Sequence, residues 1–394
     1  MKTLKDFDFK NKIALVRVDF NVPLDEKFNI TDTTRIDLGV NTIRYILNKG
    51  GKCVVMSHLG RPRGLGFEKK FSLVHILKYF SKILNQEIPL IKDYFINEFN
   101  IENYLHDSNI VLLENLRFYS EEKQNDEYFS RNLASMGDIY VNNAFGTSHR
   151  KHSSTYGIIN HIKNYCIGDL VEDEIKNIEK VLYDNKKPFT AILGGSKVSD
   201  KINVIKRLVD LVDNIIIGGA MANTFLKANG VSVGRSLFEE DKIDIALQLQ
   251  ENARKKNVKI YLPVDFTCAR SLDDKMTEIF DVKSIPSNYS CYDIGNKTVA
   301  LFKQIILKSN KIIWNGPMGV FEIDKFSTGT FNICDMVATS TDNGTFSLVG
   351  GGDSVASVKI NNKEKNISFI STGGGALLEY IANGSLPSLE LLRS

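Results

Sequence analysis

The sequence predicts an α/β protein made of two doubly wound, parallel-sheet domains of the Rossmann-like kind. Its 394 residues exceed the size of one ordinary domain. Short β-branched runs alternate with amphipathic helical patterns along the whole chain, as expected for parallel strands joined by crossover helices. The alternating strands and helices form two groups, one in each half of the chain. A charged amphipathic stretch, Asp169–Leu182, follows Gly168 and separates them, so we expect a domain boundary after residue 168.

The expected elements follow the chain in order. In the first segment we expect helices at 72–84 and 128–136 and strands at 13–20, 52–57, 110–114 and 139–143. In the second segment we expect strands at 189–193, 215–217, 259–264, 311–314, 345–349 and 367–371. These strands are rich in apolar residues, which is typical of parallel strands buried on both faces.

The composition excludes several classes of protein. Hydrophobic residues make up 43%, charged residues 25%, and the net charge is +3, so nothing calls for a nucleic-acid partner. The five cysteines are widely spaced and form no CxxC motif, which indicates reduced thiols in a reducing compartment. The N-terminus has no apolar signal core, and no long apolar run could span a membrane. We therefore expect a cytoplasmic protein.

The segment at residues 17–24, RVDFNVPL, ends the first strand and is the most informative stretch of the chain. Asp19 and Asn21 stand two residues apart at the carboxyl end of that strand, so they should share one face. Ligands of α/β proteins bind at this edge of the sheet. A carboxylate and an amide there can bind a hydroxylated, acidic small molecule. A strand end with a turn cap explains the same residues equally well.

Basic residues recur after the strands of the first segment. His58 and Arg61 follow the second strand, Arg117 and Arg150 follow the next two, and Arg35 follows the turn after the first. Any one of them could be solvated surface charge. Because successive strand ends converge on one crevice in an open parallel sheet, their repetition favours an anion pocket.

Glycine pairs follow the strands of the second segment. Gly194 and Gly195 precede Lys197 and Lys201, which we expect on one face of a helix near its N-terminus, as a clamp for a polyphosphate. The chain contains neither a Walker A sequence nor a GxGxxG fingerprint.

Further glycine clusters and polar strand ends extend this pattern. They comprise Gly218–Gly219, Gly350–Ser354 and Gly373–Gly375. Asp353 is the only acid in these turns, which makes it a candidate magnesium ligand, a helix N-cap, or both. Asn315 and Glu322 could contact phosphates and ribose hydroxyls, or could be a turn residue and a surface acid.

Taken in order, these segments resemble the phosphoglycerate kinase family over nearly the whole chain. The matching segments are RVDFNVPL (17–24), SHLGRPRG (57–64), LLENLRF (112–118), FGTSHRKH (145–152), GGSKVSDK (194–201), WNGPMGVFE (314–322), GGGDS (350–354) and STGGG (371–375). The resemblance implies two domains facing each other across a hinged cleft. Residues 1–168 would bind 3-phosphoglycerate or 1,3-bisphosphoglycerate, with residues 376–394 returning to this domain, and residues 169–375 would bind ADP or ATP with Mg²⁺.

The resemblance also implies roles for individual residues. Phosphoglycerate would be bound by Asp19, Phe20, Asn21, Arg35, His58, Leu59, Gly60, Arg61, Arg117 and Arg150. Nucleotide would be bound by Gly194, Gly195, Lys197, Lys201, Gly218, Gly219, Asn315, Glu322, Gly350, Gly351, Gly352, Asp353 and Ser354, with Asp353 as the metal ligand. The moving phosphoryl group would be contacted by the catalytic set of Arg35, Lys197, Gly373, Gly374 and Gly375.

Some expectations stay open at this level. Asn143 stands where the family usually has Asp, which leaves the local charge near Arg150 undecided. A two-domain kinase of another phosphorylated carboxylic acid is the alternative enzyme, and a non-catalytic nucleotide or sugar-phosphate binding module is the alternative class. We expect a monomer with small-molecule substrates, whose hinges lie near residues 168–171 and 371–375.

Overall fold

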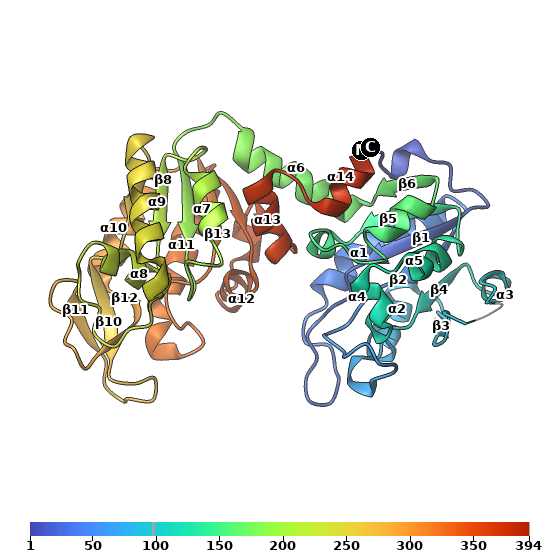
Figure 1. Cartoon of the computed structure of the whole chain (residues 1–394), viewed down its shortest axis with the longest axis horizontal. Helices are drawn as coiled ribbons and strands as arrows, with labels where there is room; N and C mark the ends of the chain where they lie inside the picture. The colour runs from blue at the N-terminus through green and yellow to red at the C-terminus, as the bar shows by residue number, and fades with distance from the viewer. Residues whose placement is uncertain (97–98, 394) are drawn as a thin grey trace. The chain divides into compact units, whose positions relative to one another are not determined.

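The computed structural model describes residues 1–96 and 99–393, and the chain forms two compact units (Figure 1). Unit 1 contains Met1–Ile175 and the segment from Ser385 onward, and unit 2 contains Lys176–Gly384. Each unit has its own parallel sheet and its own hydrophobic core. The predicted α/β class with two parallel sheets is therefore confirmed.

Unit 1 is built on a six-stranded sheet in which all strand pairs are parallel. Its strands, in spatial order, are β3 (Leu90–Ile91), β4 (Ile110–Leu113), β2 (Lys52–Met56), β1 (Ile13–Val18), β5 (Ile139–Asn143) and β6 (Asn164–Ile167). Its helices are α1 (Thr34–Asn48), α2 (Val74–Leu84), α3 (Glu102–Leu105), α4 (Ser120–Gln124), α5 (Glu127–Ala134) and α14 (Pro387–Arg393). The chain turns from β1 to β2 on one side and reaches β5 on the other, so β1 ends at a topological switch point, where α/β sheets open a ligand crevice.

The first strand is shorter than the sequence predicted. It ends at Val18, and the backbone then curls, with Val22 N donating to Phe20 O at 2.9 Å. Phe20 N donates to the Ser57 hydroxyl at 2.9 Å instead of to a ladder partner. Asp19 and Asn21 are therefore placed by a turn rather than by the two-residue period of a strand.

Unit 2 repeats the arrangement with a second six-stranded parallel sheet. Its strands, in spatial order, are β15 (Phe369–Ile370), β14 (Phe346–Val349), β13 (Lys311–Asn315), β7 (Phe189–Leu193), β8 (Asn214–Ile217) and β9 (Lys259–Tyr261). Its helices are α7 (Ile202–Leu208), α8 (Met221–Ala228), α9 (Ile243–Lys255), α10 (Asn296–Ile306), α11 (Thr328–Asp342), α12 (Gly352–Ile360) and α13 (Gly375–Asn383). The switch point falls at β7, directly before Gly194.

A second, antiparallel sheet in unit 2 is absent from the sequence prediction. It contains β10 (Asp265–Ala269), β11 (Glu278–Asp281) and β12 (Ser290–Ile294), in the order β11-β10-β12. Polar residues interrupt the sequences of these strands, DFTCA, EIFD and SCYDI, and β11 is largely exposed, so they lack the continuous apolar run that marks a buried parallel strand. The short strands β3 and β6 were missed for the same lack of a long pattern.

The two units are joined by α6 (Asp169–Tyr183) and again after α13. Contacts divide the chain within α6, after Ile175, and after Gly384, whereas the sequence predicted boundaries after residues 168 and 375. The second difference has a clear cause, because α13 packs against α7 inside unit 2. The final helix, α14, lies against β6 of unit 1, as Figure 1 shows.

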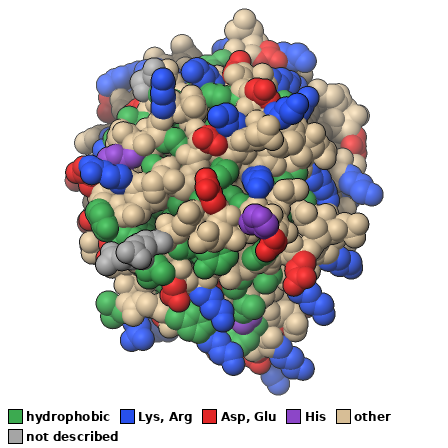
Figure 2. All heavy atoms as spheres, turned by 90° about the vertical axis from the view of Figure 1, so that its right-hand side faces the viewer, with side chains coloured by type: hydrophobic (Ala, Val, Ile, Leu, Met, Phe, Trp, Pro, Cys, Tyr) green, Lys and Arg blue, Asp and Glu red, His purple; other side chains and the backbone are tan. Residues whose placement is uncertain are grey.

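The surface carries both signs of charge. On the face drawn in Figure 2, basic and acidic side chains are interspersed, which fits the small net charge of +3. Among the helices that the structure describes, none is long and apolar enough to cross a bilayer.

Candidate functional site

An acidic and a basic side chain meet at the switch point of unit 1. Arg35, from the first turn of α1, places Nη1 2.6 Å from Oδ2 of Asp19. The Asp19 side chain is 11% exposed and that of Arg35 is 32% exposed, so the pair is partly screened by solvent. The structure thus brings these two predicted residues together just after the carboxyl end of β1, with the Arg35 side chain partly exposed.

The loop at residues 57–64 is fixed by polar contacts from two sides. Asn21 Oδ1 accepts a hydrogen bond from Gly60 N at 2.8 Å, and Arg117 Nη1 donates to Gly60 O at 2.9 Å. Gly60 has φ +64°, and a Cβ there would lie 2.3 Å from the Phe71 ring, so this position requires glycine. Arg117 is only 4% exposed, and its Nε has no hydrogen-bond partner among the described residues. A buried, unpaired N–H of a charged group is a donor available to an anion.

His58 marks the centre to which the predicted basic residues converge. Burial lowers its pKa well below the usual value, and the positive charges of Arg117, Arg17, Arg35 and Arg150 lower it further. His58 is therefore neutral at physiological pH. Three of the predicted arginines, Arg35, Arg117 and Arg150, therefore lie close enough to His58 to act on its charge, together with Arg17.

Arg17 is the residue of this cluster that sequence reasoning did not select. It lies within β1 and is fully buried, and its Nε donates to Ser154 Oγ at 2.9 Å. Ser154 Oγ in turn donates to the buried Glu122 at 2.6 Å. Arg17 Nη2 lies 3.3 Å from His58 Nδ1. Because arginine can only donate, Nδ1 accepts, and Nε2 of the neutral imidazole carries the proton. The available signal was an arginine inside an otherwise apolar strand.

The remaining predicted residues of unit 1 divide into buried and exposed groups. The side chains of Phe20 and Leu59 are 0% and 3% exposed, so they support the crevice from the core. Arg61 and Arg150 are exposed, and Arg150 Nε donates to His149 Nε2 at 3.1 Å. Burial, followed by the Arg150 charge, lowers the pKa of His149 to about 4.

Asn143 takes no part in the basic cluster. It is fully buried, and its Nδ2 donates to Gly39 O at 3.2 Å while its Oδ1 accepts from Leu170 N at 3.1 Å. The amide thus supplies both a donor and an acceptor, and it joins α1 to the start of α6. An aspartate carboxylate would only accept hydrogen bonds here.

In unit 2, two glycine turns interlock at the end of β7. Gly194 N donates to Asn315 O and Gly195 N donates to Pro317 O, each at 3.0 Å. A Cβ on Gly194 would lie 2.0 Å from Pro317 O, so the close approach of these backbones excludes any side chain. Gly219 N donates to Met318 O at 3.0 Å and completes the junction. Three predicted segments therefore form one rigid floor.

The predicted arrangement of Lys197 and Lys201 on one helical face is wrong. Helix α7 begins only at Ile202, with Lys201 as its N-cap residue, and Lys197 lies in the preceding loop. That loop is held by Ser199, whose N and Oγ both donate to the Glu239 carboxylate, at 3.0 and 2.6 Å. Lys197 is exposed, whereas burial lowers the pKa of Lys201. The tertiary contact to Glu239 overrides the local helical pattern.

Asp353 lies in the first turn of α12, but it is not the N-cap. Gly351 is the N-cap, and Asp353 is exposed, so this carboxylate is available to a ligand. Nearby, Asn315 Nδ2 donates to Gly350 O at 2.8 Å and Ser354 Oγ accepts from Gly316 N at 2.5 Å. Asn315 and Ser354 are both buried and therefore brace the turn.

The residues around Asp353 fit a nucleotide-bound magnesium ion rather than a resident metal centre. In the described part of the chain, no three His, Cys, Asp or Glu side chains could hold a metal together. Mg²⁺ carried by a nucleotide needs only one or two carboxylates, because phosphate oxygens and water complete its coordination. A single exposed carboxylate beside a glycine-rich turn satisfies that requirement.

The final glycine cluster forms the start of α13. Gly374 is the N-cap with φ +52°, and Gly373 N donates to Ser371 Oγ at 3.1 Å. Leu377, in the first turn of α13, is fully buried, and its Cδ2 lies 2.1 Å from where a Gly350 Cβ would be. The apolar contact of Leu377 with Gly350 thus couples the last two glycine turns of unit 2.

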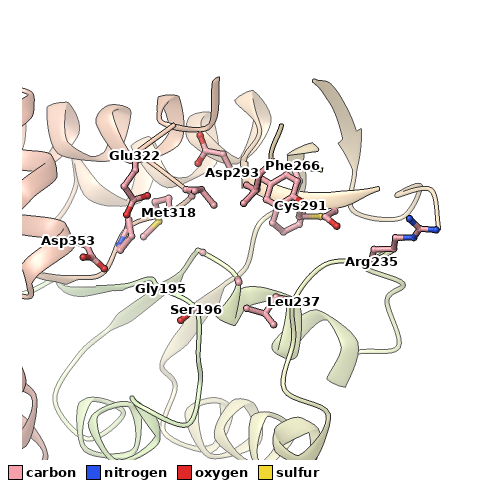
Figure 3. A pocket seen from close by; sticks show the side chains of 18 residues that line it. Gly195, Ser196, Arg235, Leu237, Phe266, Cys291, Asp293, Met318, Glu322 and Asp353 are labelled. Carbon is pink, nitrogen blue, oxygen red and sulfur yellow. The ribbon is translucent and has the colours of Figure 1, made fainter. Parts of the chain in front are cut away.

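A cavity of about 550 Å³ opens beside the glycine floor (Figure 3). Its lining includes four predicted nucleotide residues, Gly195, Gly219, Glu322 and Asp353. Much of the remaining lining is apolar and was not predicted: it includes Leu237, Phe266, Leu272, Cys291, Met318 and Val320. A flat base can pack on such a wall while the polar side receives phosphates. Sequence reasoning missed these residues because isolated apolar side chains are indistinguishable from core.

The fold and the two sites define an α/β protein of the phosphotransferase class, with a basic cluster around His58 in one unit and a cavity of about 550 Å³ beside glycine turns in the other. The comparisons give the particular family. The sequence model of phosphoglycerate kinase matches residues 4–384. The chain therefore belongs to the phosphoglycerate kinase family, and the predicted kinase activity is confirmed at that level.

Individual relatives agree with this assignment. A phosphoglycerate kinase of Finegoldia magna is 45% identical over 396 residues, covering 99% of this chain and 98% of the relative. That of Aquifex aeolicus is 45% identical over 390 residues, covering 98% and 97%. The solved structure of phosphoglycerate kinase from Coxiella burnetii superposes with a TM-score of 0.88 at 38% identity, covering 100% of this chain and 98% of that one.

Proposed function

We propose that this protein transfers a phosphoryl group between 1,3-bisphosphoglycerate and ADP, giving 3-phosphoglycerate and ATP, with the acid bound in unit 1 and the nucleotide in unit 2. The observation that carries this assignment is the separation of the two kinds of site. Unit 1 gathers Arg35, Arg117 and Arg150 around a neutral His58, which suits a small polyanion. Unit 2 holds a cavity with an apolar wall and a glycine floor, which suits a nucleotide.

Each member of the unit 1 cluster has a distinct part in this scheme. Arg117 offers its buried, unpaired Nε, and Arg150 offers an exposed guanidinium, to the acid's phosphate or carboxylate. His58 donates from Nε2, since Nδ1 already accepts from Arg17. Asp19 and Asn21 lie at the same strand end, where they can bind the hydroxyl of the acid and hold Arg35 and the loop at residues 57–64.

The reaction needs no general base. In the direction written, an oxygen of the ADP β-phosphate attacks and the carboxylate of 3-phosphoglycerate leaves. A carboxyl group has an ordinary pKa of about 4, so it leaves as the anion, and in the reverse reaction it is already ionised when it attacks. The protein has to position the reactants and to neutralise the charge on the transferred phosphoryl group in the transition state. Arg35, Lys197 and the backbone amides of Gly373–Gly375 serve this task. Bound Mg²⁺, held by Asp353 and the nucleotide, would supply further neutralisation of phosphate charge.

The same scheme implies that the protein works alone and in the cytoplasm. The five cysteines are all free thiols, which is the state expected in a reducing compartment. A monomer suffices, because each proposed site is formed by residues of one chain. We expect no nucleic-acid partner.

Binding measured by calorimetry tests the division of labour. We expect Arg150→Ala to weaken 3-phosphoglycerate binding by about tenfold, the worth of one charge-assisted contact, and to leave ADP binding unchanged. Glu322→Ala should weaken ADP binding and leave 3-phosphoglycerate binding unchanged. If both variants weakened the same ligand, the assignment of one ligand to each unit would be wrong. A coupled assay with 1,3-bisphosphoglycerate, run beside other acyl phosphates, separates this activity from a kinase of another phosphorylated acid.

A further inference from the structure

Two cysteines lie next to each other in the wall of the unit 2 cavity. Sγ of Cys268, in β10, and Sγ of Cys291, in β12, are 3.6 Å apart, and both are free thiols. Cys268 is fully buried, while Cys291 keeps 9% of its surface and lines the cavity (Figure 3). The pair therefore has one member that a small solute can reach and one that it cannot.

An irregularity in the antiparallel ladder brings the two residues into register. Phe266 pairs with Ile294 and Thr267 with Asp293, but Cys268 then pairs with Cys291, so Tyr292 is skipped. A regular ladder would have placed Cys268 opposite Tyr292. Directly paired residues of antiparallel strands have Cα atoms about 4.5–5.5 Å apart. That spacing lies within the range of about 4.4–6.8 Å that a disulfide requires.

The local chemistry assigns different roles to the two sulfurs. Cys268 donates its S–H to Cys291 Sγ, and this hydrogen bond lowers the pKa of Cys291. A hydrogen bond to the thiolate makes Cys291 the better nucleophile, and it is also the exposed member. The pKa of Cys268 is raised by the same contact and by burial. Cys268 is thus placed to react second, with a neighbour that has already been oxidised.

We propose that Cys268 and Cys291 form an oxidative modification site, which a peroxide entering the cavity converts to an intramolecular disulfide. The Cys291 thiolate attacks one peroxide oxygen, so an S–O bond forms, the O–O bond breaks, and hydroxide leaves and is protonated to water. Cys268 sulfur then attacks Cys291 sulfur; the S–S bond forms, the S–O bond breaks, and a second water leaves. In sum, two thiols and hydrogen peroxide give one disulfide and two waters.

A bound nucleotide should protect the pair, and this second step rests on the proposed nucleotide site. Cys291 is reached through the same cavity that receives the nucleotide. If only the empty protein reacts, the oxidation rate follows the unoccupied fraction. At an ADP concentration ten times its Kd, that fraction is about one tenth, so oxidation should slow by about tenfold.

The experiment treats the full chain with hydrogen peroxide and maps its peptides by mass spectrometry. We expect a linked pair of peptides containing Cys268 and Cys291, lost on treatment with dithiothreitol, while the other three thiols still react after denaturation. C291A should abolish the link, and C334S, which changes another buried cysteine of unit 2, should not. Circular dichroism of each variant should match that of the unmodified protein, which checks that the variant is folded.

The outcomes test two claims separately: that Cys268 and Cys291 form a disulfide, and that a bound nucleotide slows its formation. Stable sulfinic acid on Cys291 without a link, or a link to any other cysteine, would overturn the proposed site. Calorimetry on the same protein measures whether ADP binds, which is needed to interpret the protection experiment. If ADP binds but does not slow the oxidation, the cavity is not the route of the peroxide and the proposal is overturned. If ADP does not bind at all while the link still forms, the nucleotide assignment fails and the modification site stands.

Discussion

Arg35→Ala tests the most specific role assigned to a single side chain. The guanidinium of Arg35 is held 2.6 Å from Asp19, and the Arg35 side chain is 32% exposed. If it meets the moving phosphoryl group, its loss removes one charge-assisted donor in the transition state. Such a donor is worth about 3 kcal/mol, which corresponds to roughly a hundredfold loss of kcat.

The stability of the variant should change much less than its rate. The Arg35–Asp19 pair is partly exposed, so its loss should cost less than about 1 kcal/mol of unfolding free energy. Steady-state kinetics and urea unfolding of the same preparation separate the two effects. Arg35→Lys should recover part of kcat, because it restores the charge but not the planar fork.

Arg131→Ala is the matched control. Arg131 also belongs to unit 1 and also forms an ion pair, with Glu127 at 2.9 Å, but it lies on the exposed face of α5. We expect its kcat to equal that of the unmodified protein. A kcat for Arg35→Ala within a few-fold of the control would refute the assignment. A loss expressed only in KM would place Arg35 in ground-state binding instead.

Three further predictions follow from the other sites. Asp353→Asn should shift the Mg²⁺ dependence of activity to higher concentration, and superimposable titration curves would exclude Asp353 as a metal ligand. Burial and nearby arginines lower the pKa of His152 to about 3 in the folded protein. Between about pH 6.5 and pH 3 the imidazole is therefore protonated in the unfolded chain but not in the folded protein. Stability should therefore fall with pH from about 6.5 toward 3, by up to about 2 kcal/mol by pH 5; His152→Gln should flatten this slope in urea unfolding and the exposed His106→Gln should not. Small-angle scattering should give a smaller radius of gyration with both ligands than with either alone, because the proposed reactants bind to different units and must meet; an unchanged radius would contradict closure.

Much of the architecture could be predicted because it depends on local sequence patterns. A parallel strand buried on both faces is rich in apolar residues, so β5, β7 and β13 can be recognised without any knowledge of their neighbours. Since parallel strands end at a common edge, the polar residues after them could be assigned to one crevice. The cluster of Arg35, Arg117 and His58 was expected on this ground and is present.

Features that depend on distant partners could not be predicted from the sequence. Lys197 and Lys201 have the spacing of a helix, yet the bonds from Ser199 to Glu239 hold this segment as a loop. The sequence gives no reason for an arginine within strand β1, whereas the structure shows that Arg17 contacts Ser154 and His58. In each case the deciding contact joins residues about 40 or more positions apart, which no local periodicity can register.

The sequence by itself determined the α/β class, the succession of the main strands along the chain, and the family, because eight motifs with their spacing are a property of the chain alone. The tertiary structure decided which of those residues meet and which lie apart. The register shift between β10 and β12 is the clearest case, since it places Cys268 against Cys291 and shapes the apolar wall of the cavity. Strand register is set by the packing of both faces and both partners together, so it is determined only when the whole unit is assembled.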